Sequence, residues 1–211
     1  QKNLIFSFIA SRLSSKNIFV HPLQPKKLKF KGVKNIIPCG INLEIFKPID
    51  KNIARKQLNF HENKNYILFS GNFENKIKNA DLAFNAIKAT GKKIELIELK
   101  GYSKKEVSLL MSAVDLLLVT SSSETGPLVV KEAMACNCPI VSTDVGDVKL
   151  VLGRTKMCFV ANQNPKTIAE KISSIIDMNK RSNGRKNMND YELKKIAVKV
   201  KNVYKKIISS K

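Results

Sequence analysis

The sequence predicts an α/β protein with a Rossmann-like parallel sheet sandwiched by helices. Short apolar runs of strand length alternate with helical patterns along the chain, which is typical of a parallel α/β sheet. Several runs are continuously apolar, for example residues 116–119, as expected of strands covered on both faces. The 211 residues, 43% of them hydrophobic, are enough for one domain with a core plus a remnant of another.

Six runs are expected to form the strands, because each is apolar, of strand length and bounded by polar or turn-forming residues. They comprise residues 17–21, 35–38, 66–71, 94–99, 115–120 and 139–143.

Three helices carry clear signals. Residues 80–90 repeat apolar side chains at helical spacing and end before Gly91, a favoured C-cap residue. Ser103 and Glu106 form a capping box at the start of the next helix. A last helix, from about Asp190, has one apolar stripe surrounded by lysines, so it needs a surface on which to lie.

Three polar segments have the composition of connections. Residues 22–34 look like an interdomain segment, residues 48–65 like a link with a short helix, and residues 179–189 like a charged loop. The chain starts on a short apolar stretch without an initiator Met, and we interpret this start as the middle of a longer product.

The charge is strongly positive, with 38 Lys and Arg against 17 Asp and Glu and a net charge of +21. Such a field attracts polyanions, so nucleic acid, anionic lipid headgroups and phosphorylated substrates all fit. The lysines are spread along the chain, Trp is absent and no nucleic-acid-binding motif is present, so we expect no specific nucleic acid partner. No apolar run approaches the roughly 18 residues that a membrane-spanning helix requires.

The four cysteines are Cys39, Cys136, Cys138 and Cys158. The C-x-C pair suggests either a metal or redox site, or small buried residues around a helix end. We favour the second interpretation, because zinc sites usually show two Cys/His pairs at ligand spacing and both histidines lie far away. Free thiols then favour a reducing, cytoplasmic compartment.

The segment from residue 120 to residue 132 carries the chemistry. It follows a buried strand, and in open α/β sheets ligands bind at the carboxyl ends of strands. Gly126 and Pro127 open a helix whose first amides, with the helix dipole, suit a phosphate; the amides are those of Gly126, Leu128 and Val129.

Two glutamates flank this helix start. Glu132 lies about 7 Å along the helix axis from its mouth, and its two oxygens match a vicinal diol such as that of a ribose. Glu124 lies in the loop before the helix. If a diphosphate binds at the helix start, Glu124 would face the group attached to its second phosphate. Either glutamate alone would be interpreted as a surface residue, but their combination with the strand and the helix start favours a site.

Glu124 and Glu132 resemble the E-x7-E signature of retaining glycosyltransferases with two Rossmann-like domains (the GT-B fold), in particular glycosyltransferase family 4. The resemblance continues through residues 133–135. Asn137 stands where the family usually has Gly, and Asn tolerates left-handed backbone. After the Val145-Gly146 turn, residues 147–149 stand where the family usually has a Glu, so this chain departs from the family pattern there.

Other segments resemble the family in the same order along the chain. Gly71 matches the glycine turn after the first strand, and Asn72 stands where Arg is common. Lys78 matches the family's phosphate-binding lysine. Because Asn72 supplies no charge, Lys78 would neutralise more of the diphosphate's negative charge. Gly101 matches the loop that borders the nucleobase.

The resemblance implies the C-terminal half of a GT-B fold. Residues 36–48 resemble the family's interdomain motif. We therefore expect residues 1–33 to be the remnant of the N-terminal acceptor domain with the interdomain segment, and residues 34–211 to be the nucleotide-sugar-binding domain with its C-terminal helix.

The implied function is retaining transfer of a sugar from a nucleotide sugar, UDP-linked, to a glycan or lipid-linked acceptor in bacterial cell-surface polysaccharide synthesis. Glu124 is the catalytic candidate. The donor-binding candidates are Gly71, Asn72, Lys78, Gly101, Gly126, Pro127, Leu128, Val129 and Glu132. We expect no cofactor and no metal, because Lys78 and the helix mouth would neutralise the leaving diphosphate.

Two alternatives stay open. One is a basic, non-enzymatic module that binds nucleic acid or anionic membrane, and the other is a different sugar-nucleotide enzyme such as an epimerase. A cytoplasmic location is expected. The basic last helix could contact the inner face of the plasma membrane, although an ordinary solvated face is favoured.

Overall fold

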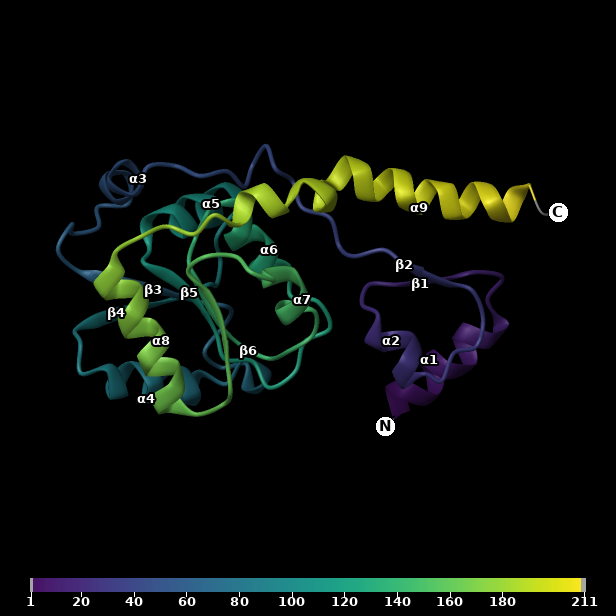
Figure 1. Cartoon of the computed structure of the whole chain (residues 1–211), viewed down its shortest axis with the longest axis horizontal. Helices are drawn as coiled ribbons and strands as arrows, with labels where there is room; N and C mark the ends of the chain where they lie inside the picture. Colours follow the sequence, from purple (N-terminus) through teal and green to yellow (C-terminus); the bar gives the residue numbers. More distant parts are fainter. Residues whose placement is uncertain (1, 210–211) are drawn as a thin grey trace. The chain divides into compact units, whose positions relative to one another are not determined.

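The computed structural model describes residues 2–209 and divides into two compact units (Figure 1). The first unit contains the described residues up to Gly40 and from Asp190 onward, and the second contains Ile41–Asn189. The last helix belongs to the first of these units. The assignment of residues 1–33 and 34–211 to acceptor and donor domains stays a prediction.

The first unit is a small α/β arrangement. Strands β1 (Asn17–Phe19) and β2 (Lys34–Ile36) pair in parallel, and Ile37, Ile196 and Val203 share a small apolar cluster. Its helices are α1 (Lys2–Leu13), α2 (Leu23–Lys27) and α9 (Leu193–Ile208). Within residues 22–34, which stay predicted as a connection or interdomain segment, the short helix α2 forms and Gln24 Oε1 accepts a 2.8 Å hydrogen bond from the Val20 amide.

The second unit contains a five-stranded parallel sheet, which confirms the predicted fold class. Its strand order is β4-β3-β5-β6-β7, with every neighbouring pair parallel. The strands are β3 (Asn65–Phe69), β4 (Ile94–Glu98), β5 (Leu116–Val119), β6 (Ile140–Thr143) and β7 (Cys158–Ala161).

Helices cover both faces of this sheet, as its continuously buried strands require. Figure 1 shows α4 and α8 on one face and α5 and α6 on the other. The core against α4 and α8 includes Phe69, Leu118, Val141, Ala83 and Ile172. The helices are α3 (Lys51–Gln57), α4 (Ala80–Thr90), α5 (Lys104–Ala113), α6 (Leu128–Ala135), α7 (Val148–Leu152) and α8 (Pro165–Met178), with 3-10 turns η1 (Lys76–Lys78), η2 (Gly184–Asn187) and η3 (Asn189–Tyr191).

The local signals of the sequence are confirmed. Gly91 ends α4 with a φ of 66°, and Ser103 and Glu106 exchange both hydrogen bonds of the capping box. Asp50 caps the short helix expected in the link, α3, by accepting from two of its first amides. The C-terminal helix begins at Leu193 rather than near Asp190.

Among the helices and strands, α1, α2, α7, α8 and β7 were not expected. Helix α8 has legible signals, because Asn164 caps it and Ile168, Ile172 and Ile175 lie buried at helical spacing. Residues 179–189 are more ordered than a free loop, since η2 forms there and Gly184 packs against Met134. Among residues 2–209, no helix combines the length and apolar character needed to cross a membrane.

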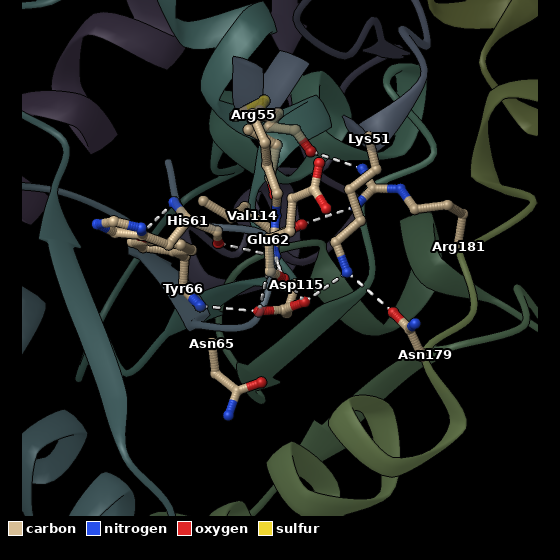
Figure 2. Close-up of polar contacts among 12 residues, drawn as sticks. Lys51, Arg55, His61, Glu62, Asn65, Tyr66, Val114, Asp115, Asn179 and Arg181 are labelled. Carbon is tan, nitrogen blue, oxygen red and sulfur yellow. Dashed lines mark hydrogen bonds and ion pairs between the residues drawn. The ribbon is translucent and has the colours of Figure 1, made fainter. Parts of the chain in front are cut away.

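A buried carboxylate ties the amino ends of two central strands together. Asp115, just before β5, accepts a 2.7 Å hydrogen bond from the Tyr66 amide of β3, and its own amide donates to the Tyr66 carbonyl at 2.8 Å. Arg55 and Lys51 of α3 both reach this carboxylate, at 3.2 and 2.6 Å (Figure 2). The side chain of Arg55 is only 4% exposed, and the Asp115 carboxylate compensates its buried charge.

Asp115→Ala is expected to destabilise the chain by about 3–5 kcal/mol, because Arg55 would stay buried without its carboxylate. Chemical denaturation of the 211-residue chain measures the free energy of unfolding. The matched control is Asp177→Ala, which removes a 62% exposed partner of Lys92 and is expected to cost at most about 1 kcal/mol. Equal losses in the two variants would contradict the structural role of Asp115.

Candidate functional site

The predicted site residues of the second unit follow the carboxyl ends of adjacent strands. Because β3, β5 and β6 are parallel neighbours, the loops after them meet at one edge of the sheet (Figure 1). Gly71 and Lys78 follow β3, and Glu124 and Gly126 follow β5. The structure thus places them where ligands bind in open α/β sheets.

Lys78 and Glu124, which are 46 residues apart, meet in an ion pair. Lys78 Nζ donates to Glu124 Oε1 at 2.6 Å, and Ser121 Oγ donates to the same oxygen at 3.0 Å. The two charged side chains are 21% and 19% exposed, so water reaches both. The residue predicted to bind the phosphates, Lys78, is thus in contact with the residue predicted to bind the sugar, Glu124.

The backbone around this pair is tethered. Thr120 Oγ1 donates to the carbonyls of Lys78 and Asn79, at 2.8 and 2.9 Å, and the Ser122 amide donates to the Ile77 carbonyl at 2.8 Å. A Cβ atom at Gly71 would lie 3.0 Å from Lys78 Cε and Cγ. Glycine therefore lets the lysine stem lie close to the turn after β3.

The start of α6 differs slightly from the expectation. Pro127 occupies the N-cap position, with φ −64° and ψ 113°, so the helix begins at Leu128 instead of at the proline. Its carbonyl accepts the first backbone hydrogen bond of the helix, from Val130 at 3.2 Å. The amides of Leu128 and Val129 precede that bond, and first-turn amides have no acceptor within a helix. They can serve an anion.

Glu132 lies one turn into α6 in a half-buried position. Burial raises the pKa of its carboxyl to about 6, and the nearby positive charge of Lys104 lowers the pKa only in part. Burial removes water from this carboxylate and disfavours its charged form. A ligand that donates hydrogen bonds to it would stabilise the charged form.

Asn72 and Gly101 lie at the same edge of the sheet, and their contacts do not by themselves indicate a ligand. Asn72 Oδ1 accepts from the Glu74 amide at 2.8 Å, so this side chain closes a local turn. Gly101 follows β4 with a φ of 81°, in the left-handed region that favours glycine.

Sequence reasoning missed two buried charges beside the site. Lys131 Nζ lies 2.7 Å from Asp147 Oδ2, and the two side chains are 1% and 5% exposed. A signal existed for Lys131, because Met134 and Ala135, three and four positions later, are apolar and place it on the buried face of α6.

The C-x-C pair marks a helix end, as favoured from the sequence. Cys136 is the C-cap of α6, and Asn137 after it adopts a left-handed φ of 51°, as its tolerance predicted. Burial raises the pKa of the Cys136 thiol to about 12 and raises that of Cys138. Within residues 2–209, no group of three or more His, Cys, Asp or Glu side chains gathers as metal ligands would.

Solved structures share the fold of this chain. Sucrose-phosphate synthase from Thermosynechococcus elongatus superposes with a TM-score of 0.86 at 20% identity, over 100% of this chain and 62% of that one. Anabaena Alr3699/HepE, in complex with UDP and glucose, superposes with a TM-score of 0.79 at 18% identity, over 99% of this chain and 67% of that one.

Two curated relatives align with most of this chain. The D-inositol 3-phosphate glycosyltransferase of Mycobacterium marinum is 24% identical over 164 residues, 64% of this chain and 34% of that protein. The putative teichuronic acid biosynthesis glycosyltransferase TuaC of Bacillus subtilis is 26% identical over 172 residues, 72% of this chain and 44% of that protein. The chain therefore spans less than half the length of these relatives.

The family model described as "Glycosyl transferases group 1" matches residues 87–195, which is more than half of the chain and includes β5, α6 and both glutamates of the E-x7-E motif. With the parallel sheet and the shared fold, this match identifies the chain as a member of the glycosyl transferases group 1 family.

Proposed function

We propose that this chain supplies the donor site of a retaining glycosyltransferase that moves a sugar from a nucleotide sugar, UDP-linked, to a glycan or lipid-linked acceptor. The observation that carries the proposal is the Lys78–Glu124 pair beside the start of α6. A cation, a helix mouth and a carboxylate then stand together where a nucleoside diphosphate joined to a sugar would present two anions and several hydroxyls.

Each group of the site has a separate task. Lys78 and the first amides of α6 stabilise the diphosphate as it takes up negative charge, an electrostatic contribution without a covalent step. Glu132 accepts hydrogen bonds from the two ribose hydroxyls. Glu124 holds hydroxyls of the transferred sugar. Lys78 and the first amides of α6 would neutralise the leaving diphosphate, and the proposal therefore includes no metal and no cofactor.

The names of two similar proteins support the proposed nucleotide and the proposed product. Anabaena HepE was solved with UDP and glucose, which favours UDP as the nucleotide here. The name of TuaC favours a cell-surface polysaccharide as the product. Helix α9 exposes Lys195, Lys199, Lys201, Lys205 and Lys206, which would suit a peripheral contact with anionic membrane, although an ordinary solvated face remains the favoured interpretation.

The nucleotide site is tested by thermal unfolding of the 211-residue chain with UDP, GDP and ADP. Ligand at 100 times its Kd is expected to stabilise the chain by about 2.7 kcal/mol. Glu132→Ala is expected to weaken binding about tenfold or more, because a hydrogen bond to a charged group contributes roughly 1.5–3 kcal/mol. Glu170→Ala, an exposed carboxylate on α8, is the matched control and should bind as the unaltered chain does.

Failure of all three nucleotides to bind, or binding that Glu132→Ala leaves unchanged, would contradict the donor-site assignment. Retention on DNA that falls with salt but ignores UDP would instead favour the basic binding module.

The raised pKa of Glu132 predicts a pH dependence. Above about pH 6 the carboxylate is ionised and accepts hydrogen bonds from both ribose hydroxyls. Below about pH 6 the carboxyl is protonated and has fewer acceptor sites for these hydrogen bonds. The affinity for UDP should therefore fall more steeply from pH 7 to pH 5 in the unaltered chain than in Glu132→Gln, since both share the titration of the phosphate. Isothermal titration at each pH measures the difference, and parallel profiles would contradict it.

The raised pKa of Glu132 also affects the free energy of unfolding. This effect favours low pH, whereas UDP binding favours high pH. The folded chain holds the Glu132 proton more tightly than the unfolded chain, so this stabilisation is complete below pH 4.5 and is lost as the pH rises to about 6. The loss is roughly 2 kcal/mol, from 1.36 kcal/mol per pKa unit. Glu132→Gln should escape it.

The Lys78–Glu124 pair predicts opposite effects for its two members. Lys78→Met should weaken UDP binding about tenfold or more and leave uridine binding unchanged, because the lysine acts on the phosphates. Glu124→Gln should tighten UDP binding, by up to about fivefold, since Lys78 no longer divides its charge between carboxylate and phosphate and such a pair contributes up to about 1 kcal/mol. A Glu124→Gln variant that binds UDP more weakly would refute the competition.

A further inference from the structure

A buried ion pair lies directly behind the turn that opens α6. Lys131 belongs to α6, and Asp147 follows the loop after β6 and precedes α7. Their charged atoms are 2.7 Å apart, and neither side chain is exposed beyond 5%. The proposed function gives neither residue a task.

Asp147 forms part of the wall of this turn. A Cβ atom at Gly126 would lie 3.3 Å from Asp147 Oδ2 and 3.4 Å from Oδ1, so the carboxylate packs against the glycine backbone. Gly146, the residue before Asp147, has a φ of 56°. A Cβ atom at Gly146 would lie 2.7 Å from the Thr125 carbonyl oxygen. Two successive residues of one loop thus touch two successive residues of the other.

The carboxylate depends on Lys131 for its place. Asp147 Oδ1 is buried and finds no hydrogen-bond partner among the described residues, so the charge is compensated through Oδ2. A buried carboxylate without a cation would either take up a proton or leave its position. Lys131 therefore holds the wall in place, and it also cancels a negative charge that would otherwise repel an anion at the helix mouth.

We propose that Lys131 and Asp147 are positioning residues for the diphosphate: together they hold the turn over residues 125–127 so that the first amides of α6 face the phosphates. This inference rests on the proposed function, because the turn matters to binding only if α6 receives a diphosphate. Preorganised donors lose much of their benefit when they are misplaced by about 1 Å.

Asp147→Ala in the 211-residue chain distinguishes positioning from local charge. Loss of a negative charge near an anion site should tighten UDP binding if charge alone matters. Loss of the wall should weaken it, by about tenfold or more if the amides move. Asp147→Asn keeps the shape of the wall, and it is expected to bind UDP within about threefold of the unaltered chain.

Two controls separate positioning from folding. Uridine, which lacks the phosphates, should bind every variant equally well, whereas a general loss of structure would weaken uridine and UDP together. Lys131→Met with Asp147→Ala leaves no uncompensated charge buried, so this double variant should fold even if Asp147→Ala does not, and it should show the same selective loss of UDP.

The outcomes identify which idea fails. An unaltered chain that binds none of UDP, GDP and ADP overturns the proposed function and this inference with it. An unaltered chain that binds UDP, together with an Asp147→Ala or double variant that binds UDP equally or more tightly, overturns the positioning role alone.

Discussion

The contact between Asp115 and the Tyr66 amide fixes how β3 and β5 stand against each other. With that end held, Ile67 pairs with Leu116 and Phe69 with Leu118 along the two strands. A slip by one residue would turn every buried side chain of a strand to the other face. The same register sets which residues emerge at the opposite edge, where the turn at Gly71 and the loop from Thr120 meet. The geometry of the site thus begins at the far end of the sheet.

The second unit compensates its important charges in pairs, and the pairs differ in burial. Asp115 with Arg55, and Lys131 with Asp147, are almost fully covered, so separating either pair would leave an uncompensated charge in the interior. Lys78 and Glu124 remain about one-fifth exposed. Water lowers the cost of separating them, so this pair can exchange partners with a ligand. Glu132, whose nearby Lys104 compensates it only in part, shows the effect of burial in its raised pKa.

The sequence predicted several features that local chemistry controls. Gly91, the Ser103–Glu106 box and the left-handed Asn137 act within a few residues, and the structure confirms each of them. Parallel topology then placed Lys78 and Glu124 at one edge, although their direct pairing could not be foreseen. Contacts such as Lys131–Asp147 and Arg55–Asp115 depend on the exact approach of distant loops and helices, which a single sequence does not encode locally. Strand β7 was not predicted although it is as long as β5 and β6; it is an edge strand of this sheet, and only Ala161 of its four residues is buried.

The burial of three thiols has a practical consequence for chemistry on this chain. Thiolates are the species that alkylating reagents attack, and burial raises the pKa of Cys136 and Cys158 to about 12 and also raises that of Cys138. Cys39 is exposed and stands one residue before Gly40, where the chain passes from the first compact unit into the second. A maleimide dye added to the native chain will therefore attach at Cys39 first. Cys39 is therefore a native labelling position next to the boundary, along the chain, between the two compact units.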